Sequence, residues 1–497
     1  MTSRAFVSPV VLALASALAL VAPDVRPDAP APAPAPAPSP AAARVPELDA
    51  AAHAIASERT FQGAAVGIAV VDVETGQLLA GVNEHLALNP ASNAKLYTAA
   101  AALATLHGDH RYVTALAGKL DGDRVDGPLA LRGFGDPSLT TEDLWAMVQE
   151  LERYGVKRVD GDIVVDQRFY DDQTTPPAFE QQPNEWAAFR APVSAVALDE
   201  NCITMTVRPG PAGGAARVSF DPPGFVDVDG TVKTGDPGAA DDVTLALAGN
   251  GPRMTAHVSG AIGGDSRLVR YTRRAEDPRL LAGYALAALL RKDGVAFGGQ
   301  VKLGNGVSGH VLARHESAPL SQLLYALGKR SDNFYAEMIF KTLGGEAKGR
   351  PARSADAAQF VTQWLSSIGI TEPGLVIKNG SGLFDANRVS PWSTAELLRW
   401  AWRDPEVQPE YVAQLSVGGV DGTLHKRFRQ QGVRRHVRAK TGTLNDVISL
   451  SGYALRDDGR APVAFSILFN RVAGKQSGAR IAADRLVGQI VRWAARR

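Results

Sequence analysis

A serine and a lysine three residues apart are the first candidates for chemistry in this chain of 497 residues. They occur in Ser92-Asn93-Ala94-Lys95, the only Ser-x-x-Lys sequence in the protein, at the start of a predicted helix. On a helix, this spacing places the hydroxyl and the amine on one face, a hydrogen bond apart. A serine hydroxyl becomes a good nucleophile when a base takes its proton, and a lysine kept neutral by burial or nearby positive charge can be that base. The motif predicts Ser92 as nucleophile and Lys95 as base, although alone it fits an N-cap serine and a solvated lysine better.

Two further motifs strengthen the catalytic interpretation. Ser331-Asp332-Asn333, the only Ser-x-Asn sequence, opens another predicted helical run, and Lys440-Thr441-Gly442-Thr443 lies in a β-like segment. A second hydroxyl can relay a proton to a leaving group, and the Asn333 amide can hold both Lys95 and a substrate carbonyl. On a strand edge, lysine and threonine can bind a carboxylate, Gly442 lets a substrate backbone approach, and the Thr443 amide can point at an oxyanion. A competing Lys233-Thr234-Gly235 runs straight into a turn, and we assign it to the surface of an insert.

Other catalytic and binding motifs are missing from the sequence. It contains no Gly-x-Ser-x-Gly elbow, which argues against an α/β-hydrolase, and no His-Glu-x-x-His metal motif. His107 and His110 have metal-ligand spacing but sit at a helix end, where histidines commonly cap carbonyls, and a site needs three or four converging ligands. Gly133-Phe134-Gly135-Asp136-Pro137 is a turn rather than a phosphate loop, because Asp-Pro follows where a helix would have to open. We therefore expect neither a metal nor a cofactor.

Hydrophobic patterning places these motifs in a mixed α/β protein. It predicts a β-hairpin between residues 66–73 and 77–80, helices over 92–106, 320–343 and 479–496, and a second hairpin between 447–455 and 463–470. Glycine, Pro-Gly turns and short β-like runs dominate the stretch between the first and second helices. We expect one domain, residues 45–108 and 312–497, to be interrupted by a mostly β insert, residues 109–311, with a sub-domain at about 209–264.

The N-terminus indicates export. Residues 1–6 carry Arg4 and no acid, residues 7–22 are mostly apolar, and Ala17-Leu18-Ala19 offers a cleavage site, as in a secretory signal. The alternative is that residues 1–22 stay as a membrane anchor. Residues 23–44 are rich in alternating Ala and Pro, which predicts an extended linker. Either alternative places the folded part in the periplasm or another extracytoplasmic space.

Composition excludes further classes of protein. The formal net charge of +1 argues against a nucleic-acid-binding protein, and the single cysteine, Cys202, rules out an intrachain disulfide framework.

In their order along the chain, the three motifs resemble those of penicillin-recognising serine enzymes. The long gap between Ser92 and Ser331 resembles the low-molecular-mass class C penicillin-binding proteins, which are D-alanyl-D-alanine carboxypeptidases and endopeptidases. The resemblance runs from about residue 50 to the C-terminus. It includes Gly133–Pro137, Ala191-Pro192, Asp199–Asn201, Gly380–Leu383, Asn387-Arg388 and Gly419–Leu424.

The resemblance implies an α/β (α+β) fold with a penicillin-recognising serine transpeptidase/β-lactamase-like core, an antiparallel sheet flanked by helices, and a large mostly β insert. It implies a serine-type D-Ala-D-Ala carboxypeptidase that acts on peptidoglycan stem peptides through an acyl-enzyme and is inhibited by β-lactams. Nucleic acid is not an expected partner, whereas a membrane contact through the N-terminus is. Carried over, Ser92 attacks, Lys95 is the base, and Ser331 and Asn333 assist proton transfer and positioning. Lys440 and Thr441 hold the terminal carboxylate, and the amides of Ser92 and Thr443 form the oxyanion hole.

One position departs from the family pattern. After Gly-Ser-Gly-Leu the family often has Ser-Arg, whereas this chain has Phe384-Asp385. An acid there would repel a side-chain carboxylate on the substrate and favour an amidated or amine-bearing peptide. Two alternatives remain from the sequence: a serine β-lactamase, which shares the motifs but lacks the insert, and a non-catalytic wall-binding scaffold.

Overall fold

The computed structural model of the chain describes residues 44–305 and 308–496. The predicted signal sequence, residues 1–22, and all but the last residue of the predicted linker, residues 23–44, therefore lie outside the described residues. The first element is helix α1 (Pro46–Ala56). None of the helices within the described ranges is both long enough and apolar enough to cross a membrane.

Six antiparallel strands form the central sheet, in the order β19-β20-β21-β22-β1-β2. Their bounds are β1 Ala65–Asp72, β2 Leu78–Val82, β19 Ser416–Val417, β20 Val437–Thr443, β21 Val447–Ala454 and β22 Val463–Asn470. Both predicted hairpins are confirmed, as β1–β2 and β21–β22. Strand β1 pairs with β22 along its whole length, so segments from the two ends of the chain share one sheet.

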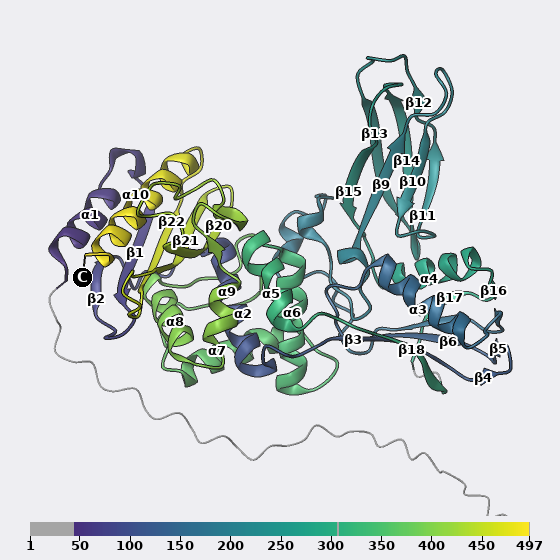
Figure 1. The fold of residues 1–497 in the computed structure, drawn as a ribbon, viewed down its shortest axis with the longest axis horizontal. Helices are drawn as coiled ribbons and strands as arrows, with labels where there is room; N and C mark the ends of the chain where they lie inside the picture. Colours follow the sequence, from purple (N-terminus) through teal and green to yellow (C-terminus); the bar gives the residue numbers. More distant parts are fainter. Residues whose placement is uncertain (1–43, 306–307, 497) are drawn as a thin grey trace, which may run out of the picture. The chain divides into compact units, whose positions relative to one another are not determined.

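Helices cover both faces of this sheet because its strands alternate apolar side chains between two cores. On β22, Ala464 and Leu468 belong to one hydrophobic cluster, whereas Phe465 and Ile467 belong to another. The second cluster contains α1 and α10, and the first contains α2 and α5 to α9, with α8 against the sheet (Figure 1). The bounds are α2 Ala94–Leu106, α5 Leu320–Tyr325, α6 Asn333–Lys348, α7 Ser354–Ser367, α8 Pro391–Arg403, α9 Gln408–Ala413 and α10 Gln476–Ala494.

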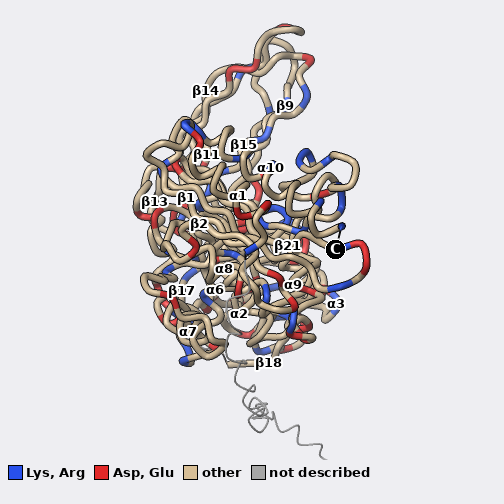
Figure 2. Tube along the Cα trace, turned by 90° about the vertical axis from the view of Figure 1, so that its left-hand side faces the viewer, with Lys and Arg blue, Asp and Glu red and all other residues tan. Residues whose placement is uncertain are grey.

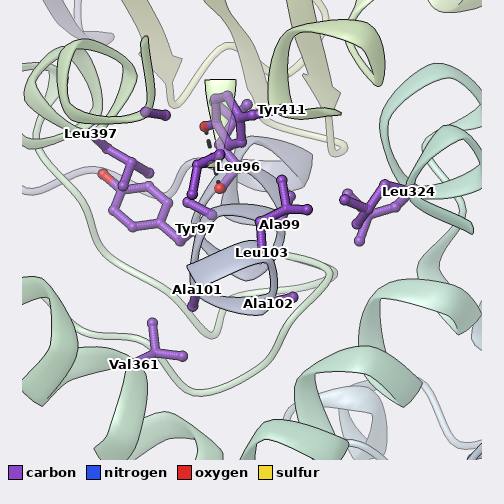
Figure 3. Close-up of a cluster of buried hydrophobic side chains, with 14 of the residues drawn as sticks. Leu96, Tyr97, Ala99, Ala101, Ala102, Leu103, Leu324, Val361, Leu397 and Tyr411 are labelled. Atoms are coloured by element: carbon purple, nitrogen blue, oxygen red, sulfur yellow. Dashed lines mark hydrogen bonds between the residues drawn. The ribbon is translucent and has the colours of Figure 1, made fainter. Parts of the chain in front are cut away.

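Helix α2 is the buried centre of the first cluster. Ala99, Ala101 and Ala102 are fully buried, and these small side chains allow α2 to pack closely against several helices at once. Figure 3 shows α2 among Leu324 of α5, Val361 of α7, Leu397 of α8 and Tyr411 of α9. The predicted helix begins two residues later than expected, since a 3₁₀ turn (Ala91–Asn93) precedes it. Burial on all sides fixes the position of the first turn of α2, which carries Lys95.

The helix predicted over residues 320–343 is broken in the structure. α5 passes into a π-helical turn (Ala326–Arg330), and Ser331 then adopts a left-handed conformation with φ +61° before α6 starts. The Asp332 side chain accepts a hydrogen bond from the Tyr335 amide and so caps α6. Apolar periodicity continues across the break, which is why the sequence predicted one helix.

Between α2 and α5 the chain forms further sheets. One has the strand order β17-β8-β6-β3-β18 and another the order β16-β7-β5-β4. The bounds are β3 Val113–Gly118, β4 Leu120–Asp121, β5 Arg124–Val125, β6 Leu129–Gly133, β7 Arg158–Val159, β8 Ile163–Asp166, β16 Ala296–Phe297, β17 Val301–Leu303 and β18 His310–Glu316. Strand β18 crosses the expected boundary between the insert, which was to end at residue 311, and the domain that resumes at residue 312. Two helices not foreseen in the insert, α3 (Thr141–Arg153) and α4 (Leu281–Lys292), pack in the same core, and α3 begins with a Thr140–Asp143 capping box.

Two small sheets share a core in the middle of the insert. The first has the order β10-β9-β15, and the second joins β11, β12 and β13 to β14. The bounds are β9 Cys202–Arg208, β10 Arg217–Asp221, β11 Val226–Gly230, β12 Lys233–Thr234, β13 Asp242–Asn250, β14 Arg253–Ile262 and β15 Val269–Arg274. The sheets extend beyond the sub-domain expected at about 209–264, because β9 and β15 flank that range. The competing Lys-Thr-Gly motif lies here, with Lys233 exposed and Thr234 buried.

Charges are mixed along the chain. The sequence has 53 Lys and Arg and 52 Asp and Glu, and Figure 2 shows the two signs interspersed over the described part of the trace. Several pairs are local and exposed, such as Lys119–Asp126 at 2.6 Å. Exposed pairs of this kind contribute little to stability.

Candidate active site

Ser92 lies in a strained turn between the sheet and α2. Its neighbour Ala91 is fully buried and has φ +46°, a backbone conformation that non-glycine residues rarely adopt. The Asn89 side chain accepts a hydrogen bond from the Ala91 amide at 2.9 Å, and the Ser449 hydroxyl donates to the Pro90 carbonyl at 2.7 Å. These contacts hold the turn against β21 and leave Ser92 half-buried at the wall of a cavity.

Lys95 is completely buried, and its amine contacts three oxygens. Nζ lies 3.0 Å from Ser92 Oγ, 2.7 Å from Asn333 Oδ1 and 2.8 Å from the Ser381 carbonyl oxygen. Burial lowers the pKa of Lys95 from 10.5 to about 7, against the opposing effects of Glu337 and Asp332. A large fraction of Lys95 is therefore uncharged near neutral pH, as a general base requires.

Ser331 and Asn333 extend this network from the start of α6. The left-handed backbone of Ser331 directs its hydroxyl to Lys440, whose Nζ donates to Ser331 Oγ at 2.7 Å. Asn333 accepts from Lys95 and donates, through Nδ2, to the Phe189 carbonyl oxygen at 2.9 Å. Because Phe189 belongs to the insert, the network joins segments that are far apart in the sequence.

Strand β20 carries the third motif. Lys440 is fully buried, and burial together with the charge of Lys95 lowers the pKa of Lys440 well below its usual value. The Thr441 hydroxyl donates to Thr423 Oγ1 at 2.8 Å. At Gly442 a Cβ would lie 2.1 Å from Ser449 Oγ and 2.9 Å from the Ser92 nitrogen, so only glycine allows β20 to pass this close to Ser92.

One edge of β20 is open beside the site. Its neighbour on that side, β19, pairs only with Ala439 and Arg438, so residues 440–443 have no strand partner on that edge within the described chain. Thr443 is exposed there. An unpaired strand edge offers backbone hydrogen bonds to an extended peptide.

The predicted residues meet at a cavity of about 1060 Å³. Ser92, Ser331, Asn333 and Thr443 line it, whereas Lys95 and Lys440 lie buried beneath its wall. Other residues that line the cavity are Asn89, Gln181, Gln182, Phe189, Leu383, Phe384, Asp385, Arg388, Leu444, Asn445, Asp446, Val447, Asn470, Arg471, Gln476, Ser477 and Arg480. The structure thus brings all three motifs to one hollow.

Asp385 lines the same cavity, but it is not an isolated acid. Its Oδ1 lies 2.6 Å from Arg388 Nη1, and this contact holds the pKa of the Asp385 carboxyl below its usual value. Arg471 and Arg480 also line the cavity, against the single further acid Asp446. The local charge is therefore balanced or basic, and the repulsion of a substrate carboxylate expected from Asp385 alone does not follow from this geometry.

Some residues of the network were not foreseen from the sequence. The Ser381 carbonyl contacts Lys95, Thr423 contacts Thr441, and the Phe189 carbonyl contacts Asn333. Ser381 and Thr423 lie in segments that carry the family resemblance, so those segments could have suggested them. A backbone carbonyl such as that of Phe189 leaves no signal in residue type.

Within residues 44–305 and 308–496, no group of three or more His, Cys, Asp and Glu side chains is arranged to hold a metal ion.

Comparison with known proteins identifies the family of the chain. Residues 48–495 match the D-Ala-D-Ala carboxypeptidase 3 (S13) family. The chain is 35% identical over 452 residues to a D-alanyl-D-alanine carboxypeptidase of Actinomadura sp., covering 87% of this chain and 82% of that protein.

Solved structures agree in fold. Penicillin binding protein 4 from Haemophilus influenzae superposes with a TM-score of 0.74 at 25% identity, covering 88% of this chain and 99% of that one. The same protein complexed with a β-lactam gives a TM-score of 0.70 at 24% identity, with 89% and 99% covered. The predicted fold class and family are confirmed: this chain belongs to the D-Ala-D-Ala carboxypeptidase 3 (S13) family of serine peptidases.

Proposed function

We propose that the chain cleaves the D-alanyl-D-alanine centre of peptidoglycan stem peptides through an acyl-enzyme on Ser92, as carboxypeptidase and endopeptidase. The observation that carries this proposal is the surroundings of the Lys95 amine. A neutral amine has two N–H bonds and one lone pair. Asn333 Oδ1 and the Ser381 carbonyl, at 2.7 and 2.8 Å, accept both N–H bonds, which leaves the lone pair for the Ser92 hydroxyl at 3.0 Å.

Acylation then begins with proton transfer from Ser92 Oγ to Lys95 Nζ. The Ser92 oxygen attacks the carbonyl carbon of the penultimate D-alanine, and the amides of Ser92 and Thr443 stabilise the oxyanion. Ser331 gives its hydroxyl proton to the nitrogen of the leaving group and regains a proton from the Lys440 amine, with which it is hydrogen-bonded at 2.7 Å. Water hydrolyses the ester in a second step: Lys95 returns its proton to Ser92 Oγ, and the proton lost by the attacking water restores Lys440.

Substrate binding uses the open edge of β20. Lys440 and Thr441 bind the terminal carboxylate, and Gly442 allows the peptide backbone to lie beside β20. Because a carboxypeptidase substrate and a cross-linked peptide present the same D-centre to Ser92, one site serves both reactions.

Asp385 and Arg388 contact the side chain of the stem peptide. In the wild-type protein, Arg388 compensates the charge of Asp385, so amidated and free diaminopimelate peptides are cleaved at similar rates. Arg388→Gln would leave the Asp385 charge uncompensated and would lower kcat/KM for the free carboxylate peptide by about tenfold relative to the amidated one, as expected for one lost charge contact. An unchanged ratio of kcat/KM values in Arg388→Gln would contradict this role.

The setting of the reaction follows from the same proposal. Residues 1–22 export the chain, residues 23–44 separate it from the membrane, and the protein works on the cell wall outside the cytoplasm. The split catalytic domain, residues 45–108 and 312–497, holds all three motifs, and residues 109–311 add a wall of the site through Phe189.

The test is covalent labelling of the full chain with a fluorescent penicillin. A stable adduct on the Ser92 peptide, located by mass spectrometry and absent in Ser92→Ala, is expected. Ser477→Ala is the matched control, since Ser477 lines the same cavity and should not affect labelling. Penicillin consumed without an adduct would indicate a β-lactamase, and intact penicillin without an adduct would indicate the scaffold.

A further inference from the structure

Glu337 is a buried carboxylate that belongs to none of the three motifs. It lies on α6, four residues after Asn333 and therefore on the same helix face, and only 1% of its surface is exposed. Its Oε1 accepts a hydrogen bond from the Ser381 amide at 2.8 Å, and its Oε2 accepts one from the Gly380 amide at 3.1 Å. Since both oxygens act as acceptors, the contacts favour the ionised carboxylate.

These hydrogen bonds connect Glu337 to Lys95, the proposed general base, through the backbone of one residue, Ser381. Glu337 binds the amide of Ser381, and the carbonyl of Ser381 accepts from Lys95 Nζ at 2.8 Å. The loop lies directly on α6, because a Cβ at Gly380 would be 2.5 Å from Phe340 Cβ and 2.6 Å from the Ala336 carbonyl oxygen. Glu337 thus holds the Ser381 carbonyl in the place from which it orients the amine.

Glu337 also acts on Lys95 by its charge. The charged groups that face Lys95 are Glu337 and Asp332 from α6 and Lys440 from β20. Burial lowers the pKa of Lys95, Glu337 opposes this more strongly than Asp332 does, and burial raises the pKa of Glu337 itself. Removing the negative charge of Glu337 would let the Lys95 pKa fall further.

We infer that Glu337 is a positioning residue for acylation: it holds the Ser381 carbonyl against Lys95, and its charge sets the pH at which Lys95 becomes a base. The inference rests on the proposed roles of Ser92 and Lys95. It concerns a residue outside all three motifs, and it predicts a pH effect that a purely structural side chain would not produce.

The experiment measures the acylation rate of the full chain with a fluorescent penicillin between pH 5 and 10. In Glu337→Gln, the midpoint of the acidic limb should move to lower pH by about one unit, because an opposite charge nearby raises a lysine pKa by about that amount. In Glu337→Asp the charge remains but the carboxylate is one methylene shorter. Its midpoint should stay near the wild-type value while its rate falls at least tenfold.

Glu396→Gln is the matched control. Glu396 is a partly buried carboxylate on α8 that pairs with Arg399 at 3.3 Å, and its loss should change neither the rate nor the midpoint. Thermal melting of each variant reports folding.

Three results would overturn the inference. The first is a folded Glu337→Gln variant with the wild-type midpoint. If Glu337→Gln does not fold, the second such result is a Glu337→Asp variant that is acylated at the wild-type rate. The third is a wild-type chain that is not acylated at Ser92, which refutes the proposed function itself and is recognised without any Glu337 variant.

Discussion

Gly382→Ala should disable acylation through a single added carbon atom. Gly382 has φ +74°, and a Cβ there would lie 1.8 Å from the Ala91 carbonyl oxygen, 2.6 Å from the Ala91 carbonyl carbon and 2.9 Å from Ala94 Cβ. To reach even 3.0 Å from that oxygen, the loop must retreat by about 1.2 Å from the turn that carries Ser92. The preceding residue, Ser381, supplies the carbonyl that accepts from Lys95, so the retreat breaks this 2.8 Å hydrogen bond.

Gly382→Ala should lower both the stability of the protein and its rate of acylation. An alanine in the left-handed region costs about 1–2 kcal/mol of stability wherever it occurs. A displacement of about 1 Å near reacting groups costs about 100-fold in rate. Gly369→Ala separates these parts, because Gly369 has φ +84° but an added Cβ would meet no atom within 4 Å.

The assay compares the second-order rate constant for acylation by a fluorescent penicillin in Gly382→Ala, Gly369→Ala and the wild type, with thermal melting of each. Gly369→Ala should melt earlier and acylate normally, whereas Gly382→Ala should acylate about 100-fold more slowly. A Gly382→Ala rate within threefold of the Gly369→Ala rate would refute the argument that this loop holds the Lys95 amine in place.

Three further outcomes are expected, at Lys440, His315 and Cys202. Lys440→Ala should lower kcat/KM by about 10–100-fold for peptides with a free terminal carboxylate and less for terminal amides, measured by product release, because a hydrogen bond to a charged carboxylate contributes about 1.5–3 kcal/mol. His315, with Nε2 at 3.4 Å from the buried Asp136 carboxylate, has a raised pKa, so its stabilising effect is complete below about pH 6.5 and is lost as pH rises through the folded value. The melting temperatures of wild type and His315→Gln should therefore differ more at pH 5.5 than at pH 8.5, and a constant difference would contradict this. Cys202 is buried and burial raises the pKa of its thiol, so alkylating reagents should label it only after unfolding; labelling of the native chain would contradict the packing.

The sequence predicted the chemistry of the site better than its geometry. Ser92, Lys95, Ser331, Asn333 and Lys440 could be chosen because their residue types and spacing are unusual in combination. Their mutual distances depend on long-range packing of α2, α6 and β20, which no local pattern encodes. Contacts made by backbone atoms, such as the Ser381 carbonyl on Lys95, were invisible for the same reason.

The charge of Asp385 shows a related limit. Phe384-Asp385 was recognised as a departure, and an unpaired acid was a fair expectation from one position. Arg388, three residues later, forms an ion pair with Asp385, so this acid is not unpaired. Asn387-Arg388 had been noted for the resemblance, but pairing across a loop depends on backbone direction, which residue types do not reveal.

Apolar periodicity in the sequence was sufficient to predict some elements of the fold but not others. Both hairpins of the central sheet were predicted because their strands are strongly apolar and bounded by turns. The break at Ser331 was not, since a left-handed residue and a π-helical turn leave the apolar pattern intact. The Ser331 hydroxyl, which accepts a hydrogen bond from Lys440, lies at that break, as expected where local strain serves a site.

The segment that contains Phe189 supplies a hydrogen-bond acceptor that the candidate site needs. Asn333 uses its oxygen on Lys95, so its Nδ2 needs a separate acceptor, which is the Phe189 carbonyl at 2.9 Å. In the same segment, the Pro177 carbonyl accepts a hydrogen bond from Asn379 Nδ2. The centroid of the Phe179 ring lies 5.8 Å from that of Phe384. Removing the segment would leave Asn333 Nδ2 without its acceptor, whereas Asn379 Nδ2 would keep the Leu383 carbonyl at 3.2 Å. An unsatisfied buried donor costs about 1–3 kcal/mol, and Asn333 would be free to turn away from Lys95. The orientation of the Lys95 amine therefore depends on residues that lie outside the three motifs and more than a hundred positions away from Asn333.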